Sequence, residues 1–321
     1  MKPVILVTAI GTITSTTIVR ELKKTGAYHL IGADINERDA IATALDVEEY
    51  HTFPLATTND YLPFILEFCE EHRVDYYYAS IDREVALLSG HRDRFEAIGT
   101  KLCIPNASLV ELCHYKNRFA AWIGERFPAI AIRSYERMED ALNAHFPLFV
   151  KPVEGVASSG CRRIDDAEML KASVRQEQIG TELLVQDCVE GDVITVDCLR
   201  NKSTGQKTQI QRRELLRNAN GCGIAVEIIE KEDLKTICDD LMEALDLNGM
   251  INMEFFETGD GYRIIEINPR FSAGSVFSCM AGVNTVLNAL RIADGLPCEF
   301  GEAAIGARFA ERYEAYRMDG K

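Results

Sequence analysis

The chain has 321 residues, 47% of them apolar and 26% charged, which is the composition of a globular protein with two or three packed units. Its net charge of −15 argues against a binder of duplex DNA or anionic membranes, because affinity for these partners is largely electrostatic. None of the ten cysteines forms a CxxC pair and the six histidines are scattered singly, so neither a zinc finger nor structural zinc is indicated. Reduced thiols and a cytoplasmic location are expected.

The first third of the chain alternates between strand and helix patterns. Strands are predicted at 4–10, 28–36 and 74–82, and helices at 16–26 and 60–73. The apolar opening lacks the basic leader and cleavage site of a signal peptide, so we interpret it as a buried first strand. This alternation predicts a parallel sheet covered on both faces. Ligands of such sheets gather at the carboxyl ends of the strands, where Gly11, Asp34 and Asp82 fall.

The pattern changes near residue 110, where we place a domain boundary. Residues 108–127 have a helical pattern, and 234–247 predict an amphipathic helix with one buried face. Strands are predicted on both sides of a loop in 147–164 and in the segment 182–200. Residues 249–271 predict a hairpin that turns at Thr258–Gly261.

The hairpin carries an unusual set of polar side chains. Pairing Phe256 with Ile264 would place Glu254 opposite Glu266 and Asn252 opposite Asn268. Directly opposed like charges destabilise a strand pair, and a hard cation between them would remove that penalty. Carboxylate and amide oxygens suit Mg²⁺ or Mn²⁺. An exposed polar hairpin face explains the composition equally well.

Two further features of the sequence could bind phosphate. Arg270 follows Asn268 by two residues and could direct its forked donors at a phosphate, while Pro269 ends the ladder. Lys151 ends a strand just before a loop rich in Gly and Ser, whose backbone N–H groups could approach phosphate oxygens. The loop lacks the P-loop spacing, and on its own a solvated hairpin loop with a surface lysine is the favoured interpretation.

Taken together, these segments resemble the ATP-grasp superfamily. The resemblance rests on Lys116, on Lys151 with its glycine-rich loop, on "LLVQDCVEGDVITVD" (183–197), and on Glu254-x11-Glu266-x-Asn268-x-Arg270. The most similar type is the large subunit of carbamoyl-phosphate synthetase and its single-copy relatives, often amino-acid ligases. The resemblance implies an α/β (α+β) fold. A Rossmann-like parallel-sheet domain (1–110) would precede a two-lobed ATP-grasp domain (111–321), with lobes at about 111–190 and 191–321.

The resemblance also implies roles for individual residues. ATP would be bound by Lys116, Lys151, the lid-loop residues Gly155, Ser158, Ser159 and Gly160, the hinge residues Gln186, Asp187, Cys188 and Val189, and Asp192. Magnesium (or manganese) ions would be held by Glu254, Glu266 and Asn268, and catalysis would use Arg270, Lys151 and Asn268. The family's hinge Glu is Asp187 here, and its ribose-contacting Glu aligns on Val193, which puts ribose recognition in doubt.

The implied function is ligation of a carboxylate, as in an amino acid, to an amine through an acyl phosphate. Small-molecule substrates are the expected partners, without nucleic acid or membrane, and a homodimer stays open. A substrate carboxylate is predicted to meet Arg212, Arg213, Ser272, Gly274 and Ser275. For the two arginines, a solvated strand face is an equal alternative.

Three other functions stay open. The first is carbamoyl-phosphate-synthase-like phosphorylation of a small carboxylate. The second is a non-catalytic regulator that binds ATP, supported only by the departures at Asp187 and Val193. The third is an NAD-dependent oxidoreductase, which the single Gly11 in place of G-x-G-x-x-G disfavours.

Overall fold

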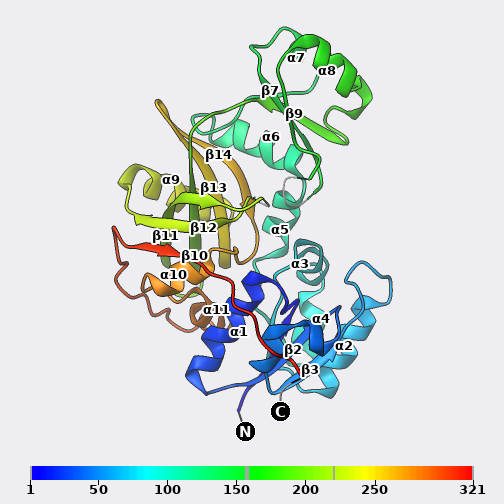
Figure 1. Ribbon diagram of the computed structural model, residues 1–321, viewed down its shortest axis with the longest axis vertical. Helices are drawn as coiled ribbons and strands as arrows, with labels where there is room; N and C mark the ends of the chain where they lie inside the picture. The colour runs from blue at the N-terminus through cyan, green and yellow to red at the C-terminus, as the bar shows by residue number, and fades with distance from the viewer. Residues whose placement is uncertain (1, 156–158, 220, 320–321) are drawn as a thin grey trace.

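In the part of the chain that the structure describes, three β-sheets follow one another along the long axis of the molecule (Figure 1). The computed structural model describes residues 2–155, 159–219 and 221–319. The fold is a mixed α/β architecture with a parallel first sheet and two antiparallel ones, which confirms the predicted fold class. No helix in the described ranges is both long and apolar enough to cross a membrane. All ten cysteines are free thiols.

The first sheet has five parallel strands in the order β3-β2-β1-β4-β5. Its strands are β1 (Val4–Thr8), β2 (His29–Asp34), β3 (Glu49–Thr52), β4 (Tyr76–Tyr78) and β5 (Lys101–Leu102). The connecting helices are α1 (Ile13–Thr25), α2 (Tyr61–Glu71), α3 (Asp82–Ser89) and α4 (Arg92–Ala97). The central strands are apolar on both faces because helices cover both, and two separate hydrophobic clusters form there.

The second sheet forms the upper lobe in Figure 1. Two helices, α5 (Ala107–His114) and α6 (Lys116–Arg126), lead to it. Its order is β6-β9-β7-β8, with β6 (Ser134–Tyr135), β7 (Leu148–Pro152), β8 (Arg162–Ile164) and β9 (Leu183–Asp187). The short helices α7 (Met138–Leu142) and α8 (Ala167–Ser173) cover one face. The predicted boundary near residue 110 falls within α5, which contacts both α3 and α6, so that division stays a prediction.

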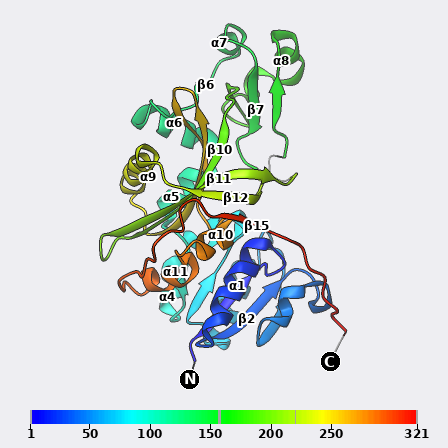
Figure 2. The ribbon, with the colours of Figure 1, turned by 60° about the vertical axis from the view of Figure 1, so that its left-hand side comes forward.

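The third sheet is antiparallel, in the order β14-β13-β10-β11-β12-β15. Its strands are β10 (Asp192–Asn201), β11 (Gln206–Arg217), β12 (Gly223–Ile229), β13 (Gly249–Thr258), β14 (Gly261–Asn268) and β15 (Arg308–Ala310). The amphipathic helix α9 (Glu232–Ala244), together with α6, packs on one apolar face. On the other side, α10 (Ser275–Met280) and α11 (Thr285–Ala293) lie between this sheet and α1 (Figure 2). The first and third sheets therefore share a hydrophobic cluster.

The hairpin register agrees with the sequence prediction at the polar positions. Glu254 pairs with Glu266 and Asn252 with Asn268, and the strands turn between Thr258 and Gly261. The predicted pairing of Phe256 with Ile264 is wrong, because Ile264 pairs with Phe255 instead. A β-bulge leaves Ile265 without a partner and shifts every pair beyond it by one residue.

Candidate active site

The hairpin β13–β14 brings two carboxylates together on one face. The Asn268 amide nitrogen donates to Glu254 Oε1 at 3.2 Å and to Glu266 Oε1 at 3.4 Å. Burial and the negative charge of Glu266 raise the pKa of Glu254 well above its usual range. One amide donor cannot neutralise two carboxylates. The two carboxylates disfavour each other's ionised form, and a divalent cation between them would relieve that repulsion.

Lys151 lies beside this acidic pair. Its ammonium Nζ donates to the carbonyl oxygen of Ile265 at 3.3 Å, at the position of the bulge. Lys151 is 7% exposed, and burial lowers its pKa while the negative charge of Glu266 opposes that shift. The bulge thus directs a backbone carbonyl from the six-stranded sheet towards a lysine of the upper lobe.

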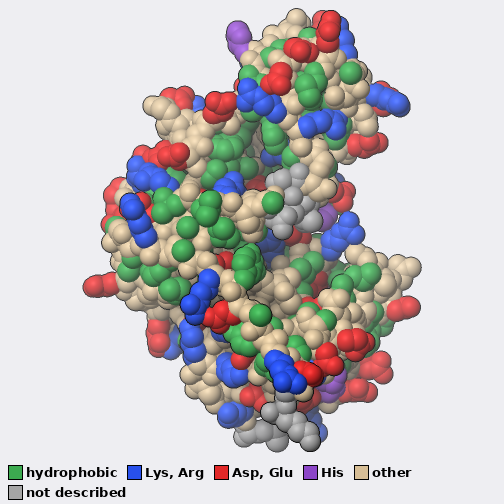
Figure 3. All heavy atoms as spheres, viewed as in Figure 1, with side chains coloured by type: hydrophobic (Ala, Val, Ile, Leu, Met, Phe, Trp, Pro, Cys, Tyr) green, Lys and Arg blue, Asp and Glu red, His purple; other side chains and the backbone are tan. Residues whose placement is uncertain are grey.

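Lys116, at the start of α6, adds a second cation. Its Nζ donates to Gly155 O at 2.7 Å, and its positive charge acts on the Lys151 ammonium. The two predicted phosphate-binding lysines are therefore neighbours. The surface is indented on the right-hand side of Figure 3, between the upper lobe and the rest of the molecule.

Arg270 joins the acidic face to the first sheet. Its Nε donates to Asp82 Oδ1 at 2.8 Å, and its Nη2 donates to Asn268 Oδ1 at 3.2 Å. Asp82 begins α3 just after β4, so one of the predicted ligand positions of the parallel sheet reaches the site. The other two predicted positions, Gly11 and Asp34, do not reach the site. Asp34 Oδ2 accepts from Gly11 N at 2.9 Å and closes the β1–α1 turn.

The predicted lid loop is described at its two ends. Ser159 and Gly160 are exposed, and Ser158 lies outside the described residues. Gly160 has a φ of 76°, and a Cβ there would approach Pro152 Cγ to 2.9 Å, so the position favours glycine.

The predicted hinge, Gln186–Val189, directs most of its polar groups at the upper lobe itself. The backbone N–H groups of Asp187 and Cys188 donate to Arg133 O and Pro147 O, at 3.0 and 3.2 Å. The Gln186 side chain donates to Ser134 Oγ at 3.0 Å. Asp192 is exposed at the start of β10.

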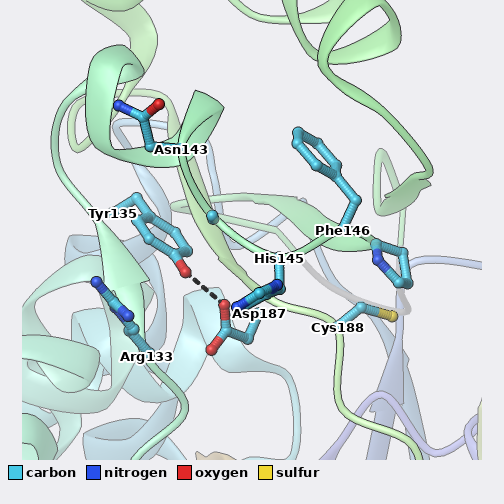
Figure 4. Close-up of a pocket in the computed structure, with 9 residues that line it drawn as sticks. Arg133, Tyr135, Asn143, His145, Phe146, Asp187 and Cys188 are labelled. Carbon is cyan, nitrogen blue, oxygen red and sulfur yellow. Dashed lines mark hydrogen bonds between the residues drawn. The ribbon is translucent and has the colours of Figure 1, made fainter.

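A cavity of about 420 Å³ adjoins the hinge (Figure 4). Tyr135 and Asp187 line it, and the Tyr135 hydroxyl donates to Asp187 Oδ1 at 2.6 Å. Strand alternation places Asp187 and Lys151 on opposite faces of the four-stranded sheet, since Asp187 pairs with Leu148. The Asp187 side chain therefore points away from the acidic pair.

The structure contradicts the prediction that Arg212 meets a substrate. Arg212 is 1% exposed, and its guanidinium donates to both oxygens of Asp197, at 2.5 and 3.1 Å. The hydroxyls of Ser272 and Ser278 accept its remaining bonds. All four hydrogen bonds of its two Nη groups are therefore made inside the protein.

The small residues after Arg270 also have a packing role. A Cβ on Gly274 would lie 3.1 Å from the Arg212 guanidinium, and the buried Ser275 hydroxyl donates to Ser272 O. The predicted room for a carboxylate at Ser272, Gly274 and Ser275 is therefore filled by Arg212.

Arg213 lies on the other face of β11. It donates to Glu257 Oε2 at 2.8 Å, and Glu257 also accepts from Lys231. The alternation of side chains along the strand separates it from Glu254 and Glu266, so this geometry gives no support to the predicted substrate role of Arg213.

Sequence reasoning missed Arg217. Its Nη2 lies 3.3 Å from Glu254 Oε2, and its Nε pairs with Glu214 at 2.6 Å. Simple alternation from Arg212 would put residue 217 on the opposite face. Two register irregularities, between Glu214 and Leu216 and between Leu216 and Arg217, return it to the acidic face.

Solved structures with the same fold are numerous. The biotin carboxylase domain of 2-oxoglutarate carboxylase from Hydrogenobacter thermophilus, in complex with MgADP, ADP and bicarbonate, is 17% identical with a TM-score of 0.75 over 94% of this chain and 72% of that one. Biotin carboxylase from Campylobacter jejuni is 15% identical, with a TM-score of 0.72 over 92% and 72%. N5-carboxyaminoimidazole ribonucleotide synthetase from Thermotoga maritima is 18% identical, with a TM-score of 0.70 over 96% and 80%. At these identities the likeness concerns the fold.

Two family models match the chain itself. Residues 180–311 match the model described as ATP-grasp in the biosynthetic pathway with Ter operon, and residues 5–103 match PylC-like, N-terminal domain. The comparison with curated proteins gave no match. The match over residues 180–311 confirms the predicted resemblance to the ATP-grasp superfamily, a class of ATP-dependent ligases. ATP and Mg²⁺, the predicted cofactors, are those of this class.

Proposed function

We propose that this protein is an ATP- and Mg²⁺-dependent ligase that joins a carboxylate to an amine through an acyl phosphate. The observation that carries the proposal is the opposed pair Glu254 and Glu266, which share one amide donor beside a buried lysine. The alternative, an exposed polar hairpin face without a ligand, does not account for this arrangement. On a solvated face the two carboxylates would extend into water rather than lie against each other.

The donor set fits magnesium. Glu254, Glu266 and Asn268 offer oxygen ligands only, and their excess negative charge is what a hard cation requires. Bound there, Mg²⁺ would neutralise charge on the phosphates of ATP. Lys116 and Lys151 would bind phosphate oxygens, and Arg270 would stabilise the phosphoryl group in transfer. Arg270 is already oriented for this by Asp82 and by Asn268 Oδ1.

Hinge and lid residues would hold the rest of the nucleotide. Because the N–H groups of Asp187 and Cys188 bond within the upper lobe, we assign recognition of the adenine edge to the backbone of Val189. Gly155, Ser159 and Gly160 would belong to the loop that closes over the phosphates and excludes water from the acyl phosphate.

The chemistry divides into two displacements. A carboxylate oxygen of the acid attacks the γ-phosphorus of ATP, and ADP leaves. The amine then attacks the acyl carbon, phosphate leaves with the electron pair of the broken C–O bond, and the nitrogen loses one proton to the departing phosphate. Alignment and charge neutralisation are the main demands of the first step, and the described cations supply both.

Arg217 replaces Arg212 and Arg213 as the proposed contact for the substrate carboxylate. Its side chain is about one-third exposed and reaches the acidic face from the end of β11. An amino acid is the proposed acid, because its carboxylate can pair with an arginine on this face while its ammonium group is attracted to the neighbouring carboxylates.

The test is substrate-dependent ADP release. The protein would be incubated with ATP, Mg²⁺ and pairs from an amino-acid and amine panel, and ADP and phosphate would be measured together. We expect equal release of both products with a matching pair, and loss of release in Glu266→Gln. The matched control is Glu257→Gln, on the same hairpin but the opposite face, which should retain activity.

Other outcomes separate the alternatives. ATP binding without turnover over the whole panel would overturn the ligase in favour of the regulator. ADP release with a small carboxylate and no need for an amine would favour carbamoyl-phosphate-synthase-like phosphorylation. Full activity of Glu266→Gln would overturn the assignment of the site.

A further inference from the structure

A second cluster of metal-ligating side chains lies far from the hairpin, at the edge of the parallel sheet. Glu49 and His51 are on the edge strand β3, and His72 is the C-cap of α2. His29, at the start of β2, lies beside them. The scattered histidines of the sequence thus include three that the fold brings to one carboxylate.

The topology explains this assembly. Residues 49 and 51 share a face of β3 because they are two apart, and β3 pairs in parallel with β2. The helix α2 covers that same face, since Phe68 packs in a cluster with Ile31 and Phe53. Its C-cap residue, His72, therefore lies beside Glu49 and His51.

We propose that Glu49, His51 and His72 form a binding site for a divalent transition metal of the Zn²⁺ class. The ligand atoms of these three residues all lie within 4.8 Å of one another. Glu49 Oε2 is 3.6 Å from His51 Nε2 and 3.7 Å from His72 Nδ1. Ligand atoms around tetrahedral zinc are about 3.4 Å apart, as follows from Zn–N and Zn–O bonds of about 2.1 Å.

Direct pairing of these groups is a weaker account of the geometry. A separation of 3.6 or 3.7 Å is too long for a hydrogen bond, so neither imidazole nitrogen bonds to Glu49 Oε2. The two nitrogens and the oxygen lie within 4.8 Å of one another, close enough for one metal ion to bind all three. The fourth position would be open to water.

The ligands are held in place by packing. The ring of Phe68 stacks on His72 with a centroid distance of 4.1 Å, and its edge contact with His51 is 4.9 Å. Phe68 is itself buried against Phe53. Both imidazoles are therefore oriented before a metal arrives, which lowers the entropic cost of binding.

His29 has the role of an outer partner. Its Nε2 lies 2.6 Å from Glu49 Oε1 and leaves Oε2 directed at the other two histidines. Metal-binding carboxylates commonly have such a hydrogen-bonded partner, which fixes their orientation. All four side chains are between 28% and 41% exposed, so an ion can enter from solvent.

This site differs chemically from the hairpin site. Two imidazoles and one carboxylate suit Zn²⁺, whereas the oxygen-only set of Glu254, Glu266 and Asn268 suits Mg²⁺. The zinc site would join the edge strand β3 to the end of α2 and should stabilise the first domain. It is independent of the proposed ligase function.

Zinc binding can be measured by isothermal titration calorimetry of the chelator-treated full chain in excess Mg²⁺. We expect one Zn²⁺ per chain. His51→Ala and His72→Ala should each weaken binding by at least roughly tenfold, and His29→Ala by about tenfold, as for outer partners of metal ligands. Glu266→Gln and the control His145→Ala, an exposed histidine of the upper lobe, should bind zinc as the wild type does.

A second measurement uses the wild type alone, so misfolding of a variant cannot affect its result. Anomalous diffraction at the zinc edge, on wild-type crystals soaked in Zn²⁺, should give a peak between Glu49, His51 and His72. Absence of binding in the wild type, unchanged binding in the double variant His51→Ala/His72→Ala, or a peak only at Glu254 and Glu266 would each overturn the proposal.

Discussion

Two polar clusters lie on the same face of the six-stranded sheet and differ in how completely their charges are paired. In the first, Arg212 and Asp197 form a bidentate ion pair, and the hydroxyls of Ser272 and Ser278 donate to the Asp197 oxygens. Asn252 adds a further donor to Asp197 at 3.0 Å. Acceptors and donors are matched, and both charged side chains are buried.

The second cluster starts two residue pairs further along the hairpin from Asn252 and Asn268, on the same face. Glu254 and Glu266 share the amide of Asn268, and Arg217 is the only cation for which a salt bridge to either of them is found among the described residues. Lys151 is close enough for the charge of Glu266 to influence its pKa. Asn268 also donates to Asn252 Oδ1 at 3.4 Å, so the two clusters are in contact.

The difference shows which cluster is structural and which can bind a ligand. A buried pair whose hydrogen bonds are all satisfied leaves nothing for a substrate and fixes the packing of the sheet. A pair of like charges lowers stability in the absence of a ligand, and a cation that binds there recovers that free energy. Type of residue alone does not separate the two, since both clusters combine arginine, carboxylate and amide.

The largest expected effect is on catalysis, at Lys151. Replacing it by Met keeps much of its volume and removes the charge beside the acidic pair. We expect kcat/KM for ATP-dependent ligation to fall about a thousandfold, a loss of roughly 4 kcal/mol of transition-state stabilisation. Steady-state ADP release would measure it.

Lys171→Met, an exposed lysine of α8, is the control for general effects of losing a lysine from the upper lobe. Activity of Lys151→Met within a few-fold of the wild type would remove Lys151 from the site and weaken the contrast between the two clusters.

The next largest effect concerns stability and tests the first cluster, in which Arg212 pairs with Asp197. Arg212→Met leaves the buried Asp197 charge without its partner, so we expect the free energy of unfolding to fall by about 3–5 kcal/mol. Urea unfolding followed by circular dichroism would measure it. In the double variant Arg212→Met/Asp197→Leu the charge is gone from both sides, and much of the loss should be recovered.

A substrate-binding role would give a different result. If Arg212 served a substrate, Arg212→Met would raise KM while leaving the urea midpoint close to that of the wild type. That outcome would reverse our correction of the sequence prediction.

Sequence patterns were sufficient for the fold class and for the acidic pair. The alternation of apolar residues indicates the strands of the sheets, and the predicted register is correct for Glu254 and Glu266. The bulge at Ile265 maintains that pairing although the outer pairs of the hairpin are shifted by one residue. Sequence patterns were insufficient at irregular positions. Bulges at Ile265 and near Arg217 change the face of the sheet on which a residue lies, and no local sequence pattern predicts them.

Burial of charge was also hidden from the sequence. Arg212 and Arg213 are adjacent and chemically identical, yet one is buried with Asp197 and the other is half-buried with Glu257 on the opposite face. The histidine cluster escaped for a related reason. His29, His51 and His72 are about twenty residues apart in sequence and meet only because β2, β3 and the end of α2 adjoin.

The smallest predicted effect is an increase in the free energy of unfolding, whereas most substitutions lower it. Glu266→Gln removes one of two opposed charges while keeping the shape of the side chain. We therefore expect the chelator-treated variant to be more stable than the wild type by about 1 kcal/mol. Urea unfolding in the presence of a chelator would show it as a higher midpoint at unchanged slope.

Addition of Mg²⁺ and ATP should then affect the stability of the wild type and of Glu266→Gln differently. The wild type should gain stability on binding, and Glu266→Gln should gain little, because the carboxylate that attracts the cation is missing. Glu257→Gln serves as the matched control, since it breaks ion pairs with Arg213 and Lys231 and should lower stability instead. If Glu266→Gln were also destabilised in the presence of a chelator, Glu254 and Glu266 would stabilise the fold. The acidic face would then be a structural cluster like that of Arg212 and Asp197.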